Sequence, residues 1–233
     1  MIINMWNMIH QLNSISGYME SQPFVSLIVL ENYHPRPEFI RCMKSLTTQN
    51  YNNYEIILVL YSKKNTNNLK KLFAENNIDE SHLFIYEFEE NLGYAKGNNV
   101  GVAKSTSDLV LISNPDVETS QDFLLKMIKS YSRLVDIKKT DKILVGPRIC
   151  NYDGIIEYSR RKINYLCFSN IDIEKTNKIR RTMISSGCSF LIKKKYFEDL
   201  NGFDESYFLY HEDVDFSIRA SLLGIKQYVD NSI

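Results

Sequence analysis

Four short apolar segments alternate with segments of helical periodicity in the first half of the chain. They span residues 25–30, 55–60, 83–88 and 109–113 and are rich in branched and aromatic side chains. A strand that is apolar along its whole length is covered on both faces, as in a parallel sheet. Parallel neighbours need crossover connections, which helices usually provide. The pattern therefore predicts an α/β protein with a mostly parallel central sheet flanked by helices.

The other segments extend this prediction. Apolar residues at helical spacing predict helices over residues 39–48, 69–76, 93–104 and 121–134. Beyond residue 141 the alternation lapses, and we expect strands over 143–149, 155–159 and 186–193, a turn over 151–154 and a short helix over 195–200. Residues 163–182 are polar and charged around a few apolar positions, so we expect a long loop there. A last helix is expected from Val214 to Gly224.

Composition limits the class of partner. With 233 residues and 44% hydrophobic content, the chain can bury a complete core without disulfides or structural metals. Its 28 basic side chains balance 28 acidic ones, so no overall field attracts nucleic acid or an anionic membrane, although local patches remain open. The four cysteines form no C-x-x-C pair, which argues against a zinc site or a disulfide framework and favours reduced thiols.

The sequence shows neither a membrane span nor a secretion signal. No segment reaches the roughly 18 apolar residues that a span requires, and the N-terminus lacks the pattern of a signal peptide, so we expect a cytoplasmic protein. Residues 1–22 carry apolar side chains at mixed helical spacing, which predicts a helical extension that covers the core, a partner or a bilayer surface. Because that stretch has almost no Lys or Arg, packing against protein is favoured. Residues 23–233 are expected to form a single domain.

The densest group of ionisable side chains lies within residues 208–216, Phe-Leu-Tyr-His-Glu-Asp-Val-Asp-Phe. One interpretation is structural: Glu212, Asp213 and Asp215 occupy the first turn of the last helix, where exposed N–H groups and the helix dipole favour negative charge. The other is functional, because carboxylates this close raise one another's pKa, and perturbed carboxylates gather at acid–base sites. The two interpretations are compatible.

Two further features follow expected strands. A helix with three glycines is expected over residues 93–104, Gly-Tyr-Ala-Lys-Gly-Asn-Asn-Val-Gly-Val-Ala-Lys. The glycines either let the backbone approach an anion such as phosphate or permit tight packing on the sheet. Their spacing matches neither the dinucleotide fingerprint nor the P-loop. Asp116 follows the strand at 109–113, at the edge where ligands of open parallel sheets bind. It is a candidate metal ligand or, alternatively, a cap for the following helix.

As an ordered set, these segments resemble the family 2 glycosyltransferases, which have the GT-A fold, and especially their bacterial rhamnosyltransferase-like branch. The matching segments are 25–30, Tyr-Asn-Asn-Tyr-Glu-Ile-Ile at 51–57, Asn-Leu-Gly-Tyr-Ala-Lys-Gly-Asn-Asn-Val-Gly at 91–101, Asn-Pro-Asp at 114–116, Gly-Pro-Arg-Ile at 146–149, Gly-Cys-Ser-Phe-Leu-Ile at 187–192 and Gly-Phe-Asp-Glu to Glu-Asp-Val-Asp at 202–215. They cover about residues 24–230 in the family's order. The resemblance implies a GT-A domain with a donor-binding half over about 23–118 and a smaller, mixed acceptor-side half over about 119–233.

The resemblance also implies roles for named residues. Asp116, at the position of the family's D-x-D-type motif, would bind Mg²⁺ or Mn²⁺ bridging the diphosphate of a nucleotide-sugar donor. Asp213, matching the acid of the family's E-D motif, would be the general base that deprotonates the acceptor hydroxyl. Glu212 and Asp215 would orient the helix and the substrate. The remaining donor-binding candidates are Tyr33, Tyr61, Asn91, Gly93, Asn98 and Asn99.

Two departures from the family pattern bear on activity. Leu60 stands near the position where the family usually has an aspartate that recognises the donor base, so either Tyr61 stacks on the base or donor binding is impaired. The chain also ends at Ile233, before the region in which many relatives place a metal-binding histidine and acceptor-binding helices.

The leading hypothesis is an inverting, metal-dependent glycosyltransferase that moves a sugar, with rhamnose as one candidate, to a glycan or lipid-linked glycan in surface polysaccharide synthesis. Peripheral association with the inner face of the membrane and a partner or second chain are further options, and no nucleic acid is expected. The alternative is a degenerate or truncated domain that binds without turnover. A sugar nucleotidyltransferase is disfavoured, because no glycine-rich, basic phosphate loop follows the first strand.

Overall fold

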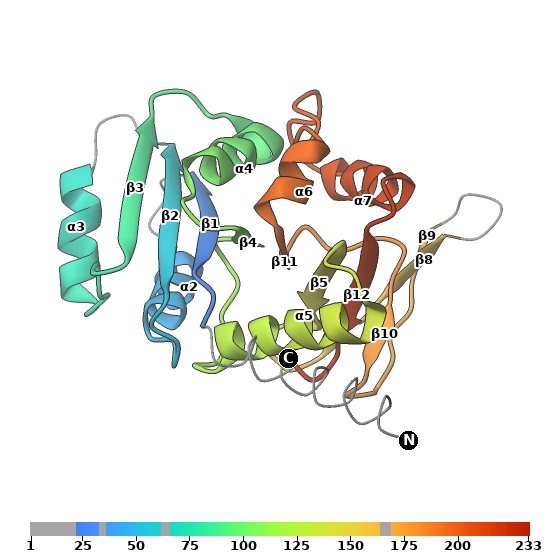
Figure 1. Cartoon of the computed structure of the whole chain (residues 1–233). Helices are drawn as coiled ribbons and strands as arrows, with labels where there is room; N and C mark the ends of the chain where they lie inside the picture. Colours follow the sequence, from blue (N-terminus) through green and yellow to red (C-terminus); the bar gives the residue numbers. More distant parts are fainter. Residues whose placement is uncertain (1–21, 33–35, 62–65, 164–168) are drawn as a thin grey trace, which may run out of the picture.

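The computed structural model describes residues 22–32, 36–61, 66–163 and 169–233 and is built on one eight-stranded sheet (Figure 1). The order of the strands is β10-β12-β5-β11-β4-β1-β2-β3. Neighbours β1–β2, β2–β3, β1–β4 and β5–β12 are parallel, whereas β11 runs antiparallel to β4 and β5, and β10 antiparallel to β12. The predicted α/β fold with a mostly parallel central sheet is therefore confirmed.

The elements of the sheet and its helices have the following bounds. The strands are β1 (Val25–Asn32), β2 (Tyr54–Tyr61), β3 (Leu83–Phe88), β4 (Leu109–Ser113), β5 (Ile143–Pro147), β10 (Ile179–Arg181), β11 (Ser189–Lys193) and β12 (Lys226–Asp230). Two small hairpins pair β6 (Ile149–Cys150) with β7 (Ile156–Tyr158) and β8 (Arg161–Ile163) with β9 (Ser169–Ile171). The helices are α2 (Pro37–Thr47), α3 (Thr66–Glu75), α4 (Gly93–Lys104), α5 (Phe123–Lys138), α6 (Lys194–Asp199) and α7 (Glu212–Leu222).

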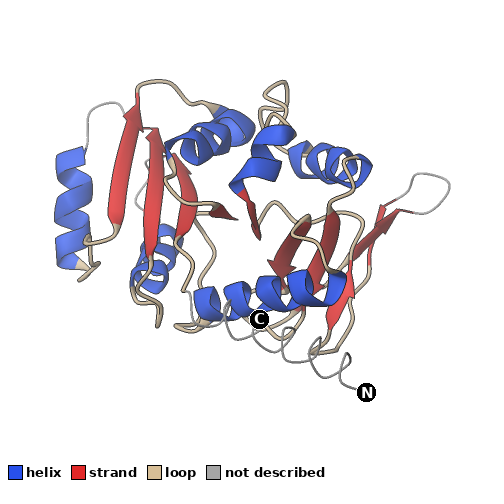
Figure 2. Ribbon diagram, viewed as in Figure 1, coloured by secondary structure: helices blue, strands red, loops and turns tan. Residues whose placement is uncertain are grey.

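Helices cover both faces of the sheet (Figure 2). Alternate residues of each strand enter one of two apolar clusters, because successive side chains of a strand point to opposite faces. On one face, Leu27 and Leu58 pack with residues of α2, α3 and α5. On the other face, Ile28 and Ile57 pack with residues of α4, α6 and α7. Burial on both faces explains why β1, β2 and β4 are almost continuously apolar in sequence.

The C-terminal half differs from expectation in three places. One is β8, which forms over residues for which no strand was expected. The long loop expected over 163–182 was wrong in part, since β9 and the edge strand β10 lie within that range. The last strand, β12, was not expected at all. Three-residue strands are too short to show a period of two, and β12 carries the polar Gln227, whose amide bonds to Ser217 and Ser221 in α7. Pairing with neighbouring strands, which the local pattern does not record, decides these segments.

Two expectations fall on parts of the chain that the structure does not describe. These are the helical extension over residues 1–22, of which only Gln22 is described, and the donor-binding role of Tyr33. Within the described ranges, no helix combines the length and apolar character needed to span a bilayer.

The glycines of α4 permit close packing on the sheet, which is one of the two roles considered for them. A Cβ atom at Gly101 would lie 2.3 Å from Cγ2 of Ile28, and one at Gly97 would lie 2.6 Å from Cδ1 of Leu30. Gly93 differs, because its φ is +71° and a Cβ atom there would lie 2.7 Å from the carbonyl oxygen of Phe208. The approach at Gly93 brings together two segments that line the pocket described below.

We expect Gly101→Ala to lower the free energy of unfolding by about 1–2 kcal/mol. Overpacking a core typically costs about 1–3 kcal/mol, and the better helix propensity of alanine offsets at most about 1 kcal/mol. Urea denaturation followed by circular dichroism measures the difference. The control is Ala103→Ser on the exposed side of the same helix, which should change stability by less than about 0.5 kcal/mol. Equal stability of the Gly101→Ala variant and the wild type would contradict the packing argument.

Candidate functional site

A pocket of about 350 Å³ opens at the carboxyl ends of β1 and β4. This is the edge of a parallel sheet where ligands bind, because the strand order reverses there and leaves a crevice. Three segments besides β1 form its walls: the start of α4, residues 114–116 after β4, and residues 208–209 before α7. Four parts of the chain that are distant in sequence therefore meet at one place.

The sequence identified some of the residues that line this pocket and missed others. Asn91, Gly93 and Asp116 were predicted and do line it. Glu31, Asn32, Arg36, Asn114, Phe208 and Leu209 also line it and were not named as site residues. Glu31 is buried, and its carboxylate lies 3.4 Å from the Arg36 guanidinium. The position of Glu31 at the carboxyl end of the first strand was the signal that could have identified it.

Three predicted donor-binding residues lie elsewhere in the described structure. Tyr61 ends β2 and is not among the lining residues of this pocket. Asn98 is buried inside α4, where its amide donates to the carbonyl of Tyr94. Asn99 exchanges two hydrogen bonds of 2.9 Å with the backbone of Phe203. The Asn99 side chain thus links α4 to the turn before α7, whereas the Asn98 bond lies within α4.

Leu60 occupies the core rather than the pocket. It is fully buried in the apolar cluster of α2, α3 and α5, and it pairs in register with Glu31 of β1. The position where the family usually has an aspartate is therefore apolar in this chain, whereas the first strand presents a carboxylate at the paired position. A buried carboxylate in a pocket wall is a hydrogen-bond acceptor that a ligand can use.

Asp116 lies in a wall shared by two pockets. The second pocket has a volume of about 790 Å³ and is lined also by Arg148, Tyr152, Glu157 and Cys188. The Tyr152 hydroxyl donates to the main-chain carbonyl of Asp116 at 3.0 Å, and its exposed ring lies 4.7 Å from the Arg41 guanidinium. Asp116 does not cap the next helix, because α5 begins at Phe123 and is preceded by Asp122. The capping alternative is therefore wrong.

Asn114 and Asp116 supply oxygen donors suited to a hard divalent cation. The side-chain oxygen Oδ1 of Asn114 is buried and has no hydrogen-bond partner in the described structure. No group of three or more His, Cys, Asp or Glu side chains is placed to hold a metal in the described ranges. Mg²⁺ is usually held by one or two carboxylates together with substrate phosphates and water. The residues present therefore fit a cation that is shared with a bound diphosphate.

The three carboxylates at the start of α7 have different environments. Asp215 forms an ion pair with Arg219, at 2.6 Å, within the helix. Glu212 is buried, and burial raises the pKa of its carboxyl above the usual value, with the charge of Asp213 acting in the same direction. Asp213 is half-buried, and its Oδ2 accepts a hydrogen bond of 3.2 Å from the Gly187 N–H. Asp213 is therefore held at one oxygen and keeps the other for a ligand.

The chain enters α7 through two residues with positive φ. Tyr210 and His211 both have φ of 71°, which is uncommon for side chains of this size. Such conformations persist where the surrounding structure determines them, and they gather at functional sites. The same segment exposes Phe208 and Leu209 beside the first pocket.

Residues 187 and 188 connect the walls of the site. The Tyr94 hydroxyl donates to the carbonyl of Gly187 at 2.5 Å, and the Asn114 N–H donates to the carbonyl of Cys188 at 2.9 Å. A Cβ atom at Gly187 would lie 3.2 Å from Cβ of Asp213 and 3.4 Å from the Tyr94 hydroxyl. Burial raises the pKa of Tyr94 well above its usual value, and Cys188 and the nearby carboxylates act in the same direction, so the hydroxyl stays protonated as a donor.

We expect Tyr94→Phe to lower the free energy of unfolding by about 1–3 kcal/mol, because it leaves the buried Gly187 carbonyl without its donor. The matched control is Tyr86→Phe, since no hydrogen bond from the half-buried Tyr86 hydroxyl is observed in the described structure and a change below about 0.5 kcal/mol is expected. Urea denaturation of both variants measures the difference. Equal effects of the two substitutions would show that the Tyr94 hydrogen bond is not a structural link.

Comparison with known proteins places this arrangement in a family. The model of the family described as glycosyl transferase family 2 matches residues 28–201. The low-salt glycan biosynthesis hexosyltransferase Agl10 of Haloferax volcanii is 27% identical over 139 residues, which are 56% of this chain and 43% of that protein. The rhamnosyltransferase WbbL of Escherichia coli is 23% identical, with 73% of this chain and 78% of that protein covered.

Solved structures with the same fold are much less similar in sequence. GalNAc-T7, crystallised with UDP, GalNAc and Mn²⁺, superposes with a TM-score of 0.71 at 15% identity. That alignment covers 89% of this chain and 42% of the GalNAc-T7 chain. This chain therefore spans less than half of the length of both Agl10 and GalNAc-T7, and the likeness to the latter shows the GT-A fold alone.

Proposed function

Because the chain belongs to glycosyl transferase family 2, we propose that it transfers a sugar from a nucleotide-diphosphate donor to a glycan or lipid-linked glycan acceptor, with inversion at the anomeric carbon. The observation that carries the proposal is the position of Asp116 in the wall between two pockets, with Asp213 joined to the same wall through residues 187 and 188. A transferase needs two substrates to meet at one point. The two pockets on either side of Asp116 meet this requirement.

The first pocket is the donor site in this proposal. Glu31, Asn32 and Arg36 lie at its β1 wall, where a nucleoside can find hydrogen-bond acceptors and donors. Glu31 then provides the carboxylate for the base that the buried Leu60 does not provide. The diphosphate lies toward Asn114 and Asp116. A fold relative crystallised with UDP and Mn²⁺ supports a nucleotide diphosphate as the class of donor.

Asn114 and Asp116 would hold Mg²⁺ or Mn²⁺ through their side-chain oxygens. When bound, the ion offsets the negative charge that develops on the leaving nucleoside diphosphate. The Asn114 N–H bond to Cys188 and the Tyr152 bond to the Asp116 carbonyl hold the backbone of this segment at two points. These bonds prepare the ligand geometry before substrates bind.

Asp213 acts as the general base. Its carboxylate takes the proton of the acceptor hydroxyl while that oxygen forms a bond to the anomeric carbon, and the bond from that carbon to the phosphate oxygen breaks. A single displacement of this kind inverts the anomeric configuration. The Gly187 N–H fixes one carboxylate oxygen, which leaves the other oxygen available to the acceptor.

The second pocket provides the acceptor site. Its lining combines the polar side chains of Arg148, Asn151 and Glu157 with the exposed ring of Tyr152, which suits the hydroxyls and the flat apolar face of a sugar. In this proposal residues 23–118 form most of the donor half and residues 119–233 most of the acceptor half, although Phe208 and Leu209 also line the first pocket. Rhamnose is the first donor sugar to test, since WbbL is a rhamnosyltransferase.

We expect Asp213→Asn to lower kcat by at least about a hundredfold, since a positioned general base contributes about 10²–10⁴-fold to the rate. Release of nucleoside diphosphate from a panel of nucleotide sugars, with and without glycan acceptors, measures the rate. Asp199→Asn in α6 is the matched control, because Asp199 is exposed and lies outside both pockets. Unchanged turnover in the Asp213 variant would exclude it as the base. Nucleotide binding without turnover on any donor would favour the alternative of a binding domain.

Substitution of Asp116 should affect only metal-dependent binding. We expect Asp116→Asn to weaken binding of a nucleoside diphosphate at least tenfold in the presence of Mn²⁺, and to leave binding without metal unchanged, because the carboxylate contributes through the cation. Isothermal titration calorimetry separates the two conditions. Asp153→Asn, in the exposed turn between β6 and β7, should bind like the wild type. A loss of equal size with and without Mn²⁺ would instead assign Asp116 a structural role.

A further inference from the structure

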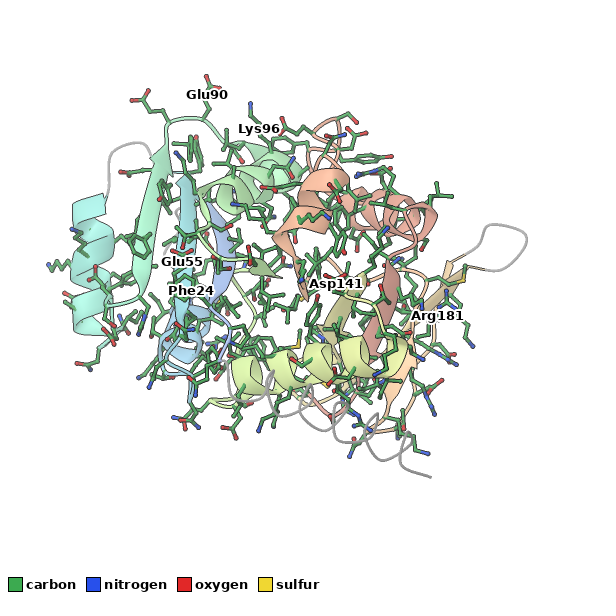
Figure 3. All side chains as sticks on the ribbon, viewed as in Figure 1. Phe24, Glu55, Glu90, Lys96, Asp141 and Arg181 are labelled. Carbon is green, nitrogen blue, oxygen red and sulfur yellow. The ribbon has the colours of Figure 1, made fainter. Side chains whose placement is uncertain are left out.

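The zero net charge of the chain conceals a strong separation of charge. Residues 73–92 carry six acidic side chains and no Lys or Arg, whereas residues 160–181 carry seven Lys or Arg side chains and only two acidic ones. The first segment includes β3 and the second includes β8, β9 and β10, and these lie at opposite ends of the molecule (Figure 1). Glu90 and Arg181 mark the two ends in Figure 3. The segment around β3 is therefore acidic, although Lys71 of α3 pairs with its Glu75, and the segment of β8 to β10 is basic.

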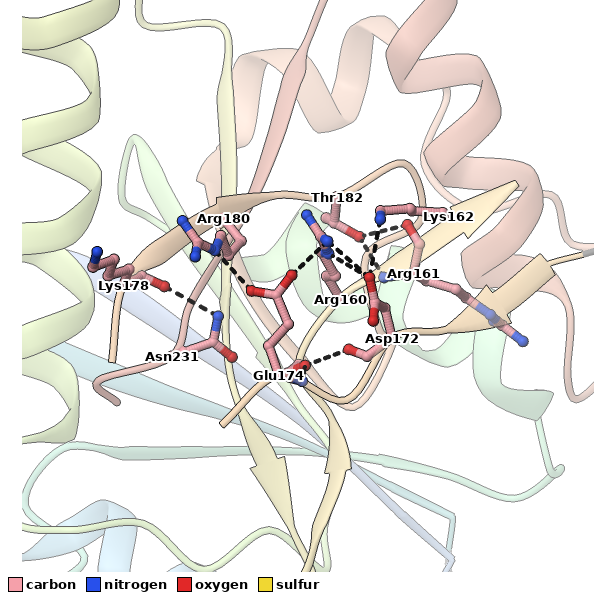
Figure 4. A network of polar contacts seen from close by, with 10 residues as sticks. Arg160, Arg161, Lys162, Asp172, Glu174, Lys178, Arg180, Thr182 and Asn231 are labelled. Carbon is pink, nitrogen blue, oxygen red and sulfur yellow. Dashed lines mark hydrogen bonds and ion pairs between the residues drawn. The ribbon is translucent and has the colours of Figure 1, made fainter. Parts of the chain in front are cut away.

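Both acidic residues of the basic segment are already neutralised (Figure 4). Asp172 forms ion pairs with Arg160 at 2.8 Å and Lys162 at 3.0 Å. Glu174 forms ion pairs with Arg160 and with Arg180, the latter at 2.7 Å. These contacts connect β8 and β10 to the segment that follows β9. Because both carboxylates of residues 160–181 are used in these ion pairs, neither is left to neutralise the remaining Lys and Arg side chains of the segment.

A groove beside this network combines cations with exposed apolar side chains. It has a volume of about 630 Å³, and Lys162, Arg181 and Lys226 are its charged lining residues. Arg181 and Lys226 form no ion pair with any described residue. Met183, 48% exposed, lines the same groove, and Leu222, 83% exposed, ends the helix that forms one side. We call Lys162, Arg181, Met183, Leu222 and Lys226 the basic face.

We propose that the basic face docks on an anionic lipid surface. Each Lys or Arg near such a surface gains attraction from the negative potential of the lipid headgroups, and apolar side chains beside the cations gain by entering the interface. A soluble polyanion would use the cations but not Met183 and Leu222. This combination of charge and apolar exposure favours a membrane over nucleic acid or an acidic polysaccharide.

The basic face lies one helix away from the candidate site. Helix α7 begins at Glu212 and Asp213 and ends at Leu222, and its 11 residues span about 16 Å. A membrane bound at the end of α7 therefore sits at a fixed distance from the proposed base. The inference rests on the proposed function in one respect only: it favours a lipid-linked glycan among the proposed acceptors. The docking itself requires no catalysis.

Sedimentation of the full chain with vesicles tests the proposal. We expect binding to vesicles of phosphatidylcholine mixed with phosphatidylglycerol, weak binding to pure phosphatidylcholine, and loss of most binding at high salt. The double variant Arg181→Glu/Lys226→Glu should bind the anionic vesicles at least tenfold more weakly, since each cation contributes separately. Lys44→Glu/Lys70→Glu makes the same change of net charge at exposed positions of α2 and α3 and should bind like the wild type.

A milder pair of variants keeps the test decisive if charge reversal disturbs folding. Arg181→Gln/Lys226→Gln removes the charges only, and circular dichroism verifies that the variant is folded. Leu222→Ser tests the contribution of the apolar side chains. It should weaken the fraction of vesicle binding that persists at high salt. Three results would each overturn the proposal. They are equal binding to anionic and neutral vesicles, an equal loss of vesicle binding in both charge-reversal variants, and binding to heparin but not to vesicles. Because the measurement is lipid binding, its outcome is independent of whether Asp213 acts as a base.

Discussion

The peptide groups of residues 187 and 188 are the constraint on which the candidate site depends. Their two carbonyls accept hydrogen bonds from Tyr94 and Asn114, and the Gly187 N–H donates to Asp213. Tyr94 and Gly187 are 93 residues apart in the sequence. Hydrogen bonds weaken steeply when their distance or angle changes. The spacing between the Asp116 segment and Asp213 is therefore determined by backbone geometry, and a Cβ atom at position 187 would make tight contacts with Asp213 and the Tyr94 hydroxyl.

The same constraint explains why neighbouring carboxylates have different properties. All three acids occupy the first turn of α7, where the helix dipole favours them. Arg219 neutralises Asp215, whereas burial raises the pKa of Glu212. Asp213 alone of the three is held by the Gly187 N–H. The structural and functional interpretations of the cluster therefore apply to different members.

The division of charge connects this site with the rest of the molecule. The acidic segment includes the edge strand β3, which β2 separates from β1 and the donor pocket of the proposed function, and the basic segment includes β8 to β10. Helix α7 links the basic segment to the site, because its first turn carries Asp213 and its last turn adjoins the groove of Arg181 and Lys226. A neutral chain can thus have one preferred orientation at a charged surface.

The amino-acid sequence alone determined the alternation of strands and helices. Each of those elements is specified by its own local pattern, and this holds best where a strand is apolar on both faces, as in β1, β2 and β4. Sequence also placed Asp116 at the carboxyl edge of the sheet, because it directly follows an expected strand, and the family resemblance implied Asn91 and Gly93 as donor-binding residues. The ordered motifs likewise indicated the family that the family model confirms.

Only the tertiary structure decided what depends on contacts between distant segments. It showed that β12 and β10 pair at the sheet edge and that Glu31 lies opposite Leu60. It further showed that Asn98 bonds within α4 and Asn99 bonds to Phe203, and that neither lines the pocket. It also showed that Gly187 joins Tyr94 to Asp213. The physical reason is the same in each case. A local sequence pattern records whether a side chain is buried, whereas the partner of a buried polar group depends on which remote segment the fold brings to it.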